Sequence, residues 1–214
     1  MTLKWIYYGL LLLCLLMLLV NAKKLARQHL FFIPVLSLAI CTQFIAESME
    51  GKPDGHYFLF HIYIPLEYLL LSMYYLLLFR SGFIKVFLIT TNLVLLVFCA
   101  AYYFWGKRMW KPDYSDFVVE SIFISFLVIY FFVRLFKTEQ SISLLRYTDF
   151  WINTGNLFFY AGCMFVMGMH YSLREQNHVL AEELLQINYY LNLILYLFYL
   201  IGFSWKRPPG KYLR

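Results

Sequence analysis

The chain has 214 residues, of which 62% are hydrophobic and only 14% are charged. A soluble domain carries about 25% charged residues, so this composition excludes a water-soluble globule. The net charge of +6 does not indicate nucleic-acid binding, because Lys and Arg alternate in density from loop to loop. That alternation is typical of a membrane protein that crosses the bilayer several times.

Seven apolar stretches are long enough for a helix that crosses the roughly 30 Å hydrocarbon core. They cover residues 5–21, 29–46, 57–79, 83–105, 117–136, 149–171 and 187–205. We therefore predict an all-α, polytopic membrane protein with seven transmembrane helices. One transmembrane domain, residues 1–205, is expected to be followed by a short basic cytoplasmic tail, residues 206–214.

The positions of Lys and Arg predict the orientation of the chain. Alternate loops divide the 18 basic residues into two unequal sets, of twelve and six. The larger set is Lys23, Lys24, Arg27, Arg80, Lys85, Arg134, Lys137, Arg146, Lys206, Arg207, Lys211 and Arg214, and the smaller is Lys4, Lys52, Lys107, Arg108, Lys111 and Arg174. The positive-inside rule then places the N-terminus outside and the C-terminus in the cytoplasm. We expect a multi-pass protein of the bacterial inner (cytoplasmic) membrane that contacts membrane lipid.

The first stretch resembles a secretory signal, but Lys23 and Lys24 follow it at once and act as a stop to export. We therefore expect an uncleaved helix. In the second stretch, Gln43 and Glu47 lie one turn apart toward the outer end.

The third stretch, residues 57–79, contains Glu67 near its middle and no Lys or Arg. A carboxylate at the centre of a bilayer costs about 2.5 to 3.5 kcal/mol, so such a residue normally faces the interior of a bundle and marks a functional site. Tyr63 shares its helical face, while His61 and Tyr68 form a neighbouring polar face. We expect a buried polar site around Glu67.

The remaining stretches add further polar residues. Glu120 lies about one turn inside the outer end of the fifth. The sixth carries one polar stripe at intervals of three and four, and Gly155 and Gly162 there permit a close helix neighbour. The stripe consists of Asn153, Asn156, Tyr160, Cys163, Met167 and His170, and Asn188, Asn192, Tyr196 and Tyr199 share a face of the seventh. Apolar residues between 179 and 185 predict a short helix on the outer surface.

Motifs for catalysis or cofactor binding are few. No P-loop or GxSxG occurs, and the seventh stretch has no lysine for a retinal Schiff base. A metal site on the outer side is one hypothesis, because four possible ligands map toward that side: Glu47, His61, Glu120 and His170. No HxxxH or HExxH pair, however, places two of them on one helical face. We expect no cofactor, and the four cysteines have no CxxC spacing that would indicate a disulfide framework or a zinc site.

The segments HIYIPLEYLLLSMYY and DFWINTGNLFFYAG, together with ILYLFYLIGF, resemble seven-helix integral membrane proteins of the Bacteroidota type. Some of these resemble the membrane-sensing region found ahead of histidine kinases. The resemblance rests on Pro65, Glu67, Tyr68, Trp151, Asn153, Gly155 and Gly162. It implies a sensory or accessory membrane module. Because this chain ends at Arg214 without a kinase, the output is expected to need a separate signalling protein as a partner.

The leading hypothesis is therefore a non-enzymatic sensory or accessory module that binds a small ligand, a lipid or a protein partner around Glu67. Neutral donors and acceptors would come from Asn153, Asn156, Tyr160, Asn188, Asn192 and Tyr196. Two alternatives stay open. The first is a transporter or channel in which Glu67 carries a proton or a cation, and the second is a metal-dependent membrane hydrolase.

Overall fold

The computed structural model describes residues 2–49, 57–79, 81–105, 114–137 and 144–205, and within these the chain is helical without strands. The main helices are α1 (Thr2–Asn21), α2 (Phe32–Ser48), α3 (Tyr57–Phe79), α4 (Gly82–Cys99), α5 (Ser115–Phe136), α6 (Thr148–Gln176) and α7 (His178–Ser204). Three short segments accompany them: η1 (Arg27–Phe31), η2 (Ala100–Trp105) and η3 (Leu144–Arg146). The predicted all-α class is confirmed, whereas the predicted basic tail lies outside the described residues.

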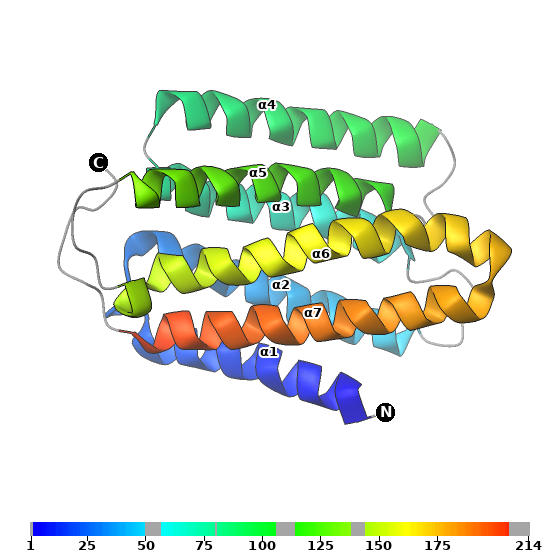
Figure 1. The fold of residues 1–214 in the computed structure, drawn as a ribbon, viewed down its shortest axis with the longest axis horizontal. Coiled ribbons are helices and arrows are strands. Elements are labelled where there is room, and N and C mark those ends of the chain that lie inside the picture. The colour runs from blue at the N-terminus through cyan, green and yellow to red at the C-terminus, as the bar shows by residue number, and fades with distance from the viewer. Residues whose placement is uncertain (1, 50–56, 80, 106–113, 138–143, 206–214) are drawn as a thin grey trace.

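The seven helices form one bundle in which each helix runs opposite to the one before it (Figure 1). The helices α1, α3, α5 and α7 begin at one end of the bundle, which we call the Tyr57 end. They finish at the other end, the Phe79 end, where η1 and the start of α6 also lie. The helix α4 lies at the edge of the bundle, whereas α6 packs between α5 and α7.

Six of the helical segments are long and apolar enough to cross a membrane. They lie within Lys4–Asn21, Arg27–Ser48, Tyr57–Phe79, Gly82–Tyr103, Ser115–Phe136 and Val179–Ser204. The sixth predicted span is not among them, although α6 has 29 residues. Polar residues such as Asp149, Asn153 and Asn156 lower its hydropathy, and all three are buried inside the bundle.

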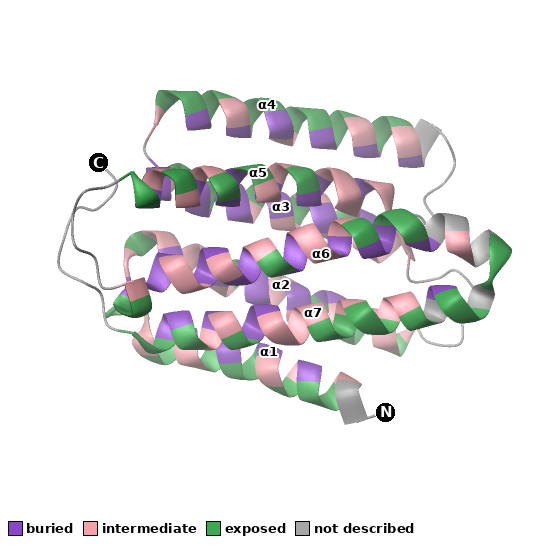
Figure 2. Ribbon diagram, viewed as in Figure 1, coloured by how far each residue is buried: buried purple, intermediate pink, exposed green. Residues whose placement is uncertain are grey.

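Large apolar side chains cover the outside of the bundle and polar ones are found inside it. Val20, Phe44 and Phe136 are more than 70% exposed, at 74%, 77% and 71%. On α4 the exposed residues form the outer face (Figure 2). Soluble monomers rarely expose continuous apolar surface on this scale, so the arrangement suits a lipid environment.

The helix ends follow the predicted boundaries with two differences. The predicted stretch 83–105 consists of α4 followed by the π-helical η2, which contains Tyr103. The predicted surface helix near residues 179–185 is not a separate element, because α7 already begins at His178. Only Asn177 separates α6 from α7, and its side-chain oxygen accepts a hydrogen bond from the backbone N–H of Leu180 at 3.2 Å.

Two glycines allow α6 and α7 to approach each other closely. A β-carbon on Gly155 would lie 2.9 Å from Cβ of Phe198, and one on Gly162 would lie 2.8 Å from a terminal methyl carbon of Leu191. Both distances are shorter than carbon–carbon contacts allow. The spacing of Gly155 and Gly162 therefore marks the close helix contact that the sequence predicts.

Candidate functional site

A cavity of about 250 Å³ lies within the half of the bundle near the Tyr57 end. Residues from α1, α2, α3, α5, α6 and α7 line it, together with Tyr114 just before α5. The lining consists of Tyr7, Gln43, Phe60, Tyr63, Ile64, Glu67, Tyr114, Phe117, Phe159, Met167, Leu185, Asn188, Tyr189, Asn192, Leu195 and Tyr196. We call this cavity the Glu67 pocket. Eight of its 16 lining residues are aromatic.

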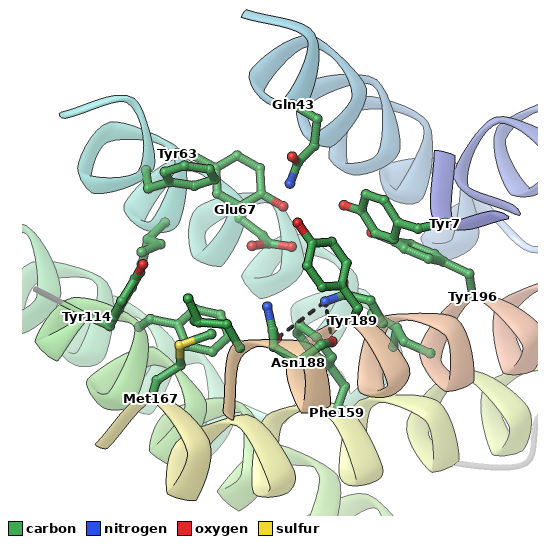
Figure 3. A pocket seen from close by; sticks show the side chains of 16 residues that line it. Tyr7, Gln43, Tyr63, Glu67, Tyr114, Phe159, Met167, Asn188, Tyr189 and Tyr196 are labelled. Atoms are coloured by element: carbon green, nitrogen blue, oxygen red, sulfur yellow. Dashed lines mark hydrogen bonds between the residues drawn. The ribbon is translucent and has the colours of Figure 1, made fainter. Parts of the chain in front are cut away.

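Glu67 supplies the only carboxylate among the described residues in the wall of the pocket. Its side chain points into the space between α1, α2 and α7 (Figure 3). Tyr63, one turn earlier on α3, also lines the pocket. Between them lies Pro65, which lacks the N–H that the carbonyl of His61 would accept from in a regular helix. None of the described residues that line the pocket is Lys, Arg or His, so these residues supply no countercharge for Glu67.

Amide and phenol groups of α7 face Glu67 across the pocket (Figure 3). The side-chain nitrogen of Asn192 donates to the carbonyl of Asn188 at 2.9 Å and to its side-chain oxygen at 3.3 Å. The ring of Tyr196, one turn further along, packs against that of Tyr7 of α1, with centroids 5.7 Å apart. The predicted residues Tyr63, Glu67, Asn188, Asn192 and Tyr196 thus line one cavity.

A second polar cluster lies at the Phe79 end and is centred on Asp149, which is buried in the first turn of α6. The carboxylate contacts Nε2 of His29 at 2.7 Å and accepts from the hydroxyl of Tyr74 at 3.0 Å and from Nε2 of Gln28 at 3.4 Å. Nδ1 of His29 accepts from the backbone N–H of Ala26 at 3.2 Å. The ring therefore carries its proton on Nε2 and donates to Asp149.

A chain of hydrogen bonds runs from Asp149 toward the middle of the bundle and joins α3, α6 and α7. Tyr199 donates to Asn156 at 2.6 Å, Asn156 to Tyr75 at 3.1 Å, Tyr75 to Asn153 at 3.1 Å, Asn153 to Tyr74 at 3.0 Å and Tyr74 to Asp149 at 3.0 Å. We call this the Tyr199–Asp149 chain. Every donor points toward the carboxylate, so the dipoles of the chain align and reinforce one another.

Another buried histidine–aspartate pair lies at the Tyr57 end. Nδ1 of His61 lies 3.0 Å from the carboxylate of Asp116, in the first turn of α5. The ring of His61 stacks on Tyr103, with centroids 3.8 Å apart. Both aspartates occupy helix N-termini, where the helix dipole favours a negative charge.

Glu120 lies one turn beyond Asp116 and is fully buried. Neither of its carboxyl oxygens has a hydrogen-bond partner among the described residues. It is close enough to Glu67 and Asp116 for electrostatic interaction, and Tyr160 of α6 interacts with both glutamates. Glu67, Asp116 and Glu120 therefore form a group of neighbouring acids in this half of the bundle.

The remaining predicted residues point elsewhere. Tyr68 is hydrogen-bonded to Thr91 of α4 at 2.6 Å, and the ring of His170 packs edge to face against Tyr114 at 5.3 Å. Glu47 is 2.7 Å from Nζ of Lys4. Within the described part of the chain, no three His, Cys, Asp or Glu side chains lie together as metal ligands. The described residues therefore provide no set of ligands for the outer metal site that the sequence analysis considered.

Sequence reasoning missed His29, Asp116 and Asp149, which lie near the ends of apolar stretches. A signal was present nonetheless. The tetrapeptides Tyr-Ser-Asp-Phe at 114–117 and Tyr-Thr-Asp-Phe at 147–150 have the same pattern, and each begins a helix. In both, the aspartate pairs with a buried histidine of another segment.

Comparisons of the chain with protein-family models, with curated proteins and with solved structures find no match.

Proposed function

We propose that this chain is a sensory or accessory membrane module that binds a small ligand in the Glu67 pocket. The observation that carries the proposal is the pocket itself: a cavity of about 250 Å³ inside the helical bundle. Ligand sites are typically concave and mostly apolar, with a few converging polar groups. Here Glu67, Asn188 and Asn192 are those groups.

The Tyr199–Asp149 chain offers a route by which occupancy of the pocket reaches the Phe79 end. Tyr196 lines the pocket, and its ring contacts that of Tyr199 edge to face with centroids 6.2 Å apart. At the other end of the chain, Asp149 holds His29 of η1. A ligand that moves α7 would therefore alter the connection between α6 and η1, and helix shifts of 1–2 Å are common in such transitions.

The proposed orientation places the Phe79 end in the cytoplasm, with seven crossings and the N-terminus outside. Seven of the nine described Lys and Arg residues, 23, 24, 27, 85, 134, 137 and 146, lie near that end, whereas Lys4 and Arg174 lie near the other. The positive-inside rule favours this orientation, with α6 as a crossing helix enclosed by α5 and α7. We infer a bacterial inner membrane and a separate signalling protein as partner.

Proton or cation transport through Glu67 is the competing proposal. The Tyr199–Asp149 chain does extend from the pocket region to the far end. However, Asn156 and Asn153 interrupt it, and an amide passes on a hydrogen bond without readily passing on a proton. The geometry favours a module that couples two sites over one that conducts.

Proteoliposomes test this choice. Wild-type protein and the Glu67→Gln variant are reconstituted, and proton, sodium and potassium fluxes are measured with entrapped indicator dyes under an imposed gradient. We expect both proteins to match protein-free liposomes. Flux by the wild type that Glu67→Gln abolishes would overturn the sensory proposal in favour of transport.

A further inference from the structure

The composition of the Glu67 pocket specifies a class of ligand. We propose that the pocket binds an organic cation, a protonated amine or a quaternary ammonium group attached to a small apolar body. This deepens the function proposed above and rests on it.

The first argument is the charge of the wall. Among the described residues of the lining, Glu67 is the only one with a carboxyl group, and none is Lys, Arg or His. The nearest described cation on α1, Lys4, is held by Glu47 at 2.7 Å. A carboxylate that is withdrawn from bulk water without a countercharge favours a ligand that brings one.

The second argument is the aromatic content. Tyr7, Tyr63, Tyr189 and Tyr196 surround the carboxylate of Glu67 (Figure 3). The face of an aromatic ring attracts cations, by about 0.5 to 2 kcal/mol per ring, and cages of such rings recognise quaternary ammonium groups. An anionic ligand would meet the same ring faces and the carboxylate unfavourably.

The third argument is the second acid behind the wall. Phe117 lines the pocket, and Glu120 lies one turn further along α5, fully buried and with both oxygens unpartnered among the described residues. It interacts electrostatically with Glu67. A cationic guest would stabilise the ionised form of this pair of neighbouring carboxyl groups, which a neutral guest of equal shape would not do.

The apolar remainder of the lining defines the rest of the ligand. Phe60, Ile64, Phe159, Met167 and Leu195 form walls without charge. The amides of Asn188 and Asn192 stand across from Glu67 and supply donors and acceptors for a polar substituent. A compact aryl-alkyl or alkyl ammonium ion fits this division.

The test uses three probes of matched shape, 2-phenylethylamine, 2-phenylethanol and phenylacetate, together with benzyltrimethylammonium. Each is titrated into the full-length protein in nanodiscs of uncharged phosphatidylcholine, and binding is measured from intrinsic fluorescence and from the shift in thermal midpoint. We expect the two cations to bind at least tenfold more tightly than the alcohol and the anion. Glu67→Gln, which keeps the shape of the side chain, should remove that preference.

A matched variant separates this inference from the function on which it rests. Asn192→Trp fills the pocket without changing its charge and should abolish binding of all probes. In one outcome the alcohol binds as tightly as the amine, and Asn192→Trp abolishes this binding whereas Glu67→Gln does not. The pocket would then be a ligand site and the cation inference would be wrong. Should no probe bind at millimolar concentration, or should Asn192→Trp leave binding unchanged, the inference and the proposed pocket would both fail.

Discussion

The Glu67 pocket and the Asp149 cluster both place a carboxyl group among tyrosine and amide side chains and both draw on α3 and α6, yet they differ in how that carboxyl group is surrounded. Asp149 is buried and is surrounded by donors from His29, Tyr74 and Gln28. Glu67 has no countercharge among the described residues that line its pocket, and a cavity of about 250 Å³ lies in front of it. One acid is satisfied by the protein, and the other faces space that a ligand can fill.

This difference distinguishes a buried polar group that stabilises a membrane bundle from one that is available to bind a ligand. A buried carboxylate whose lone pairs are all used holds helices together, and its loss leaves donors without acceptors. A carboxylate beside a cavity contributes less to the stability of the fold, because few hydrogen bonds offset the cost of removing it from water. Functional sites tend to hold such incompletely compensated groups.

The largest expected effect comes from exchanging each acid for its amide. Asp149→Asn replaces a charged acceptor by a neutral amide: its oxygen can still accept from His29 and Tyr74, but these bonds lose their charge assistance, and its NH2 group faces the side-chain nitrogen of Gln28. We expect a loss of about 2 to 3 kcal/mol, which corresponds to a fall in thermal midpoint of roughly 5 to 10 °C for a chain of this size. Glu67→Gln should leave the midpoint unchanged or raise it.

Thermal unfolding of the purified variants in detergent, monitored by fluorescence, measures both. The comparison between the two regions would be wrong if Glu67→Gln destabilised the protein as much as Asp149→Asn does. It would be sharpened if His29→Gln, which retains a donor near Asp149, lost less stability than His29→Leu.

A smaller effect is expected at the α6–α7 contact that supports both regions. Alanine at Gly155 would meet Cβ of Phe198, which is fixed to its helix, so we expect a loss of about 1 to 2 kcal/mol from overpacking. Alanine at Gly162 would meet the two terminal methyl groups of Leu191, at 2.8 and 2.9 Å, and this flexible side chain can rotate away. There the gain in helix propensity, about 1 kcal/mol, should make the substitution neutral or stabilising.

The same unfolding assay distinguishes the two glycines. Equal effects of Gly155→Ala and Gly162→Ala would show that the interhelical distance, and not the rigidity of the opposing atom, sets the cost.

Sequence reasoning reached the helical class and most helix boundaries because apolar length and 3.6-residue periodicity are local properties. Boundaries 57–79 match α3 residue for residue. The sequence also predicted the polar stripe on α6, but it did not predict that the stripe serves two regions. Asn153 and Asn156 join the Asp149 cluster, whereas Met167 lines the pocket. Whether a residue of the stripe meets a hydrogen-bond partner or a cavity depends on the neighbouring helices, and the periodicity of one helix does not specify these neighbours.

The central claim is that Glu67 faces a cavity, whereas the Asp149 cluster is filled by its own hydrogen-bonded side chains. Cysteine accessibility tests it most directly. Asn192→Cys in the pocket and Asn156→Cys in the Tyr199–Asp149 chain are placed in a protein whose exposed Cys41 has been replaced by Ser, because Cys14, Cys99 and Cys163 are buried. Both are treated with 2-aminoethyl methanethiosulfonate, and modification is followed by mass spectrometry. We predict that the cysteine at 192 reacts at least tenfold faster than that at 156. Equal rates in folded protein, or an unreactive cysteine at 192, would contradict the account.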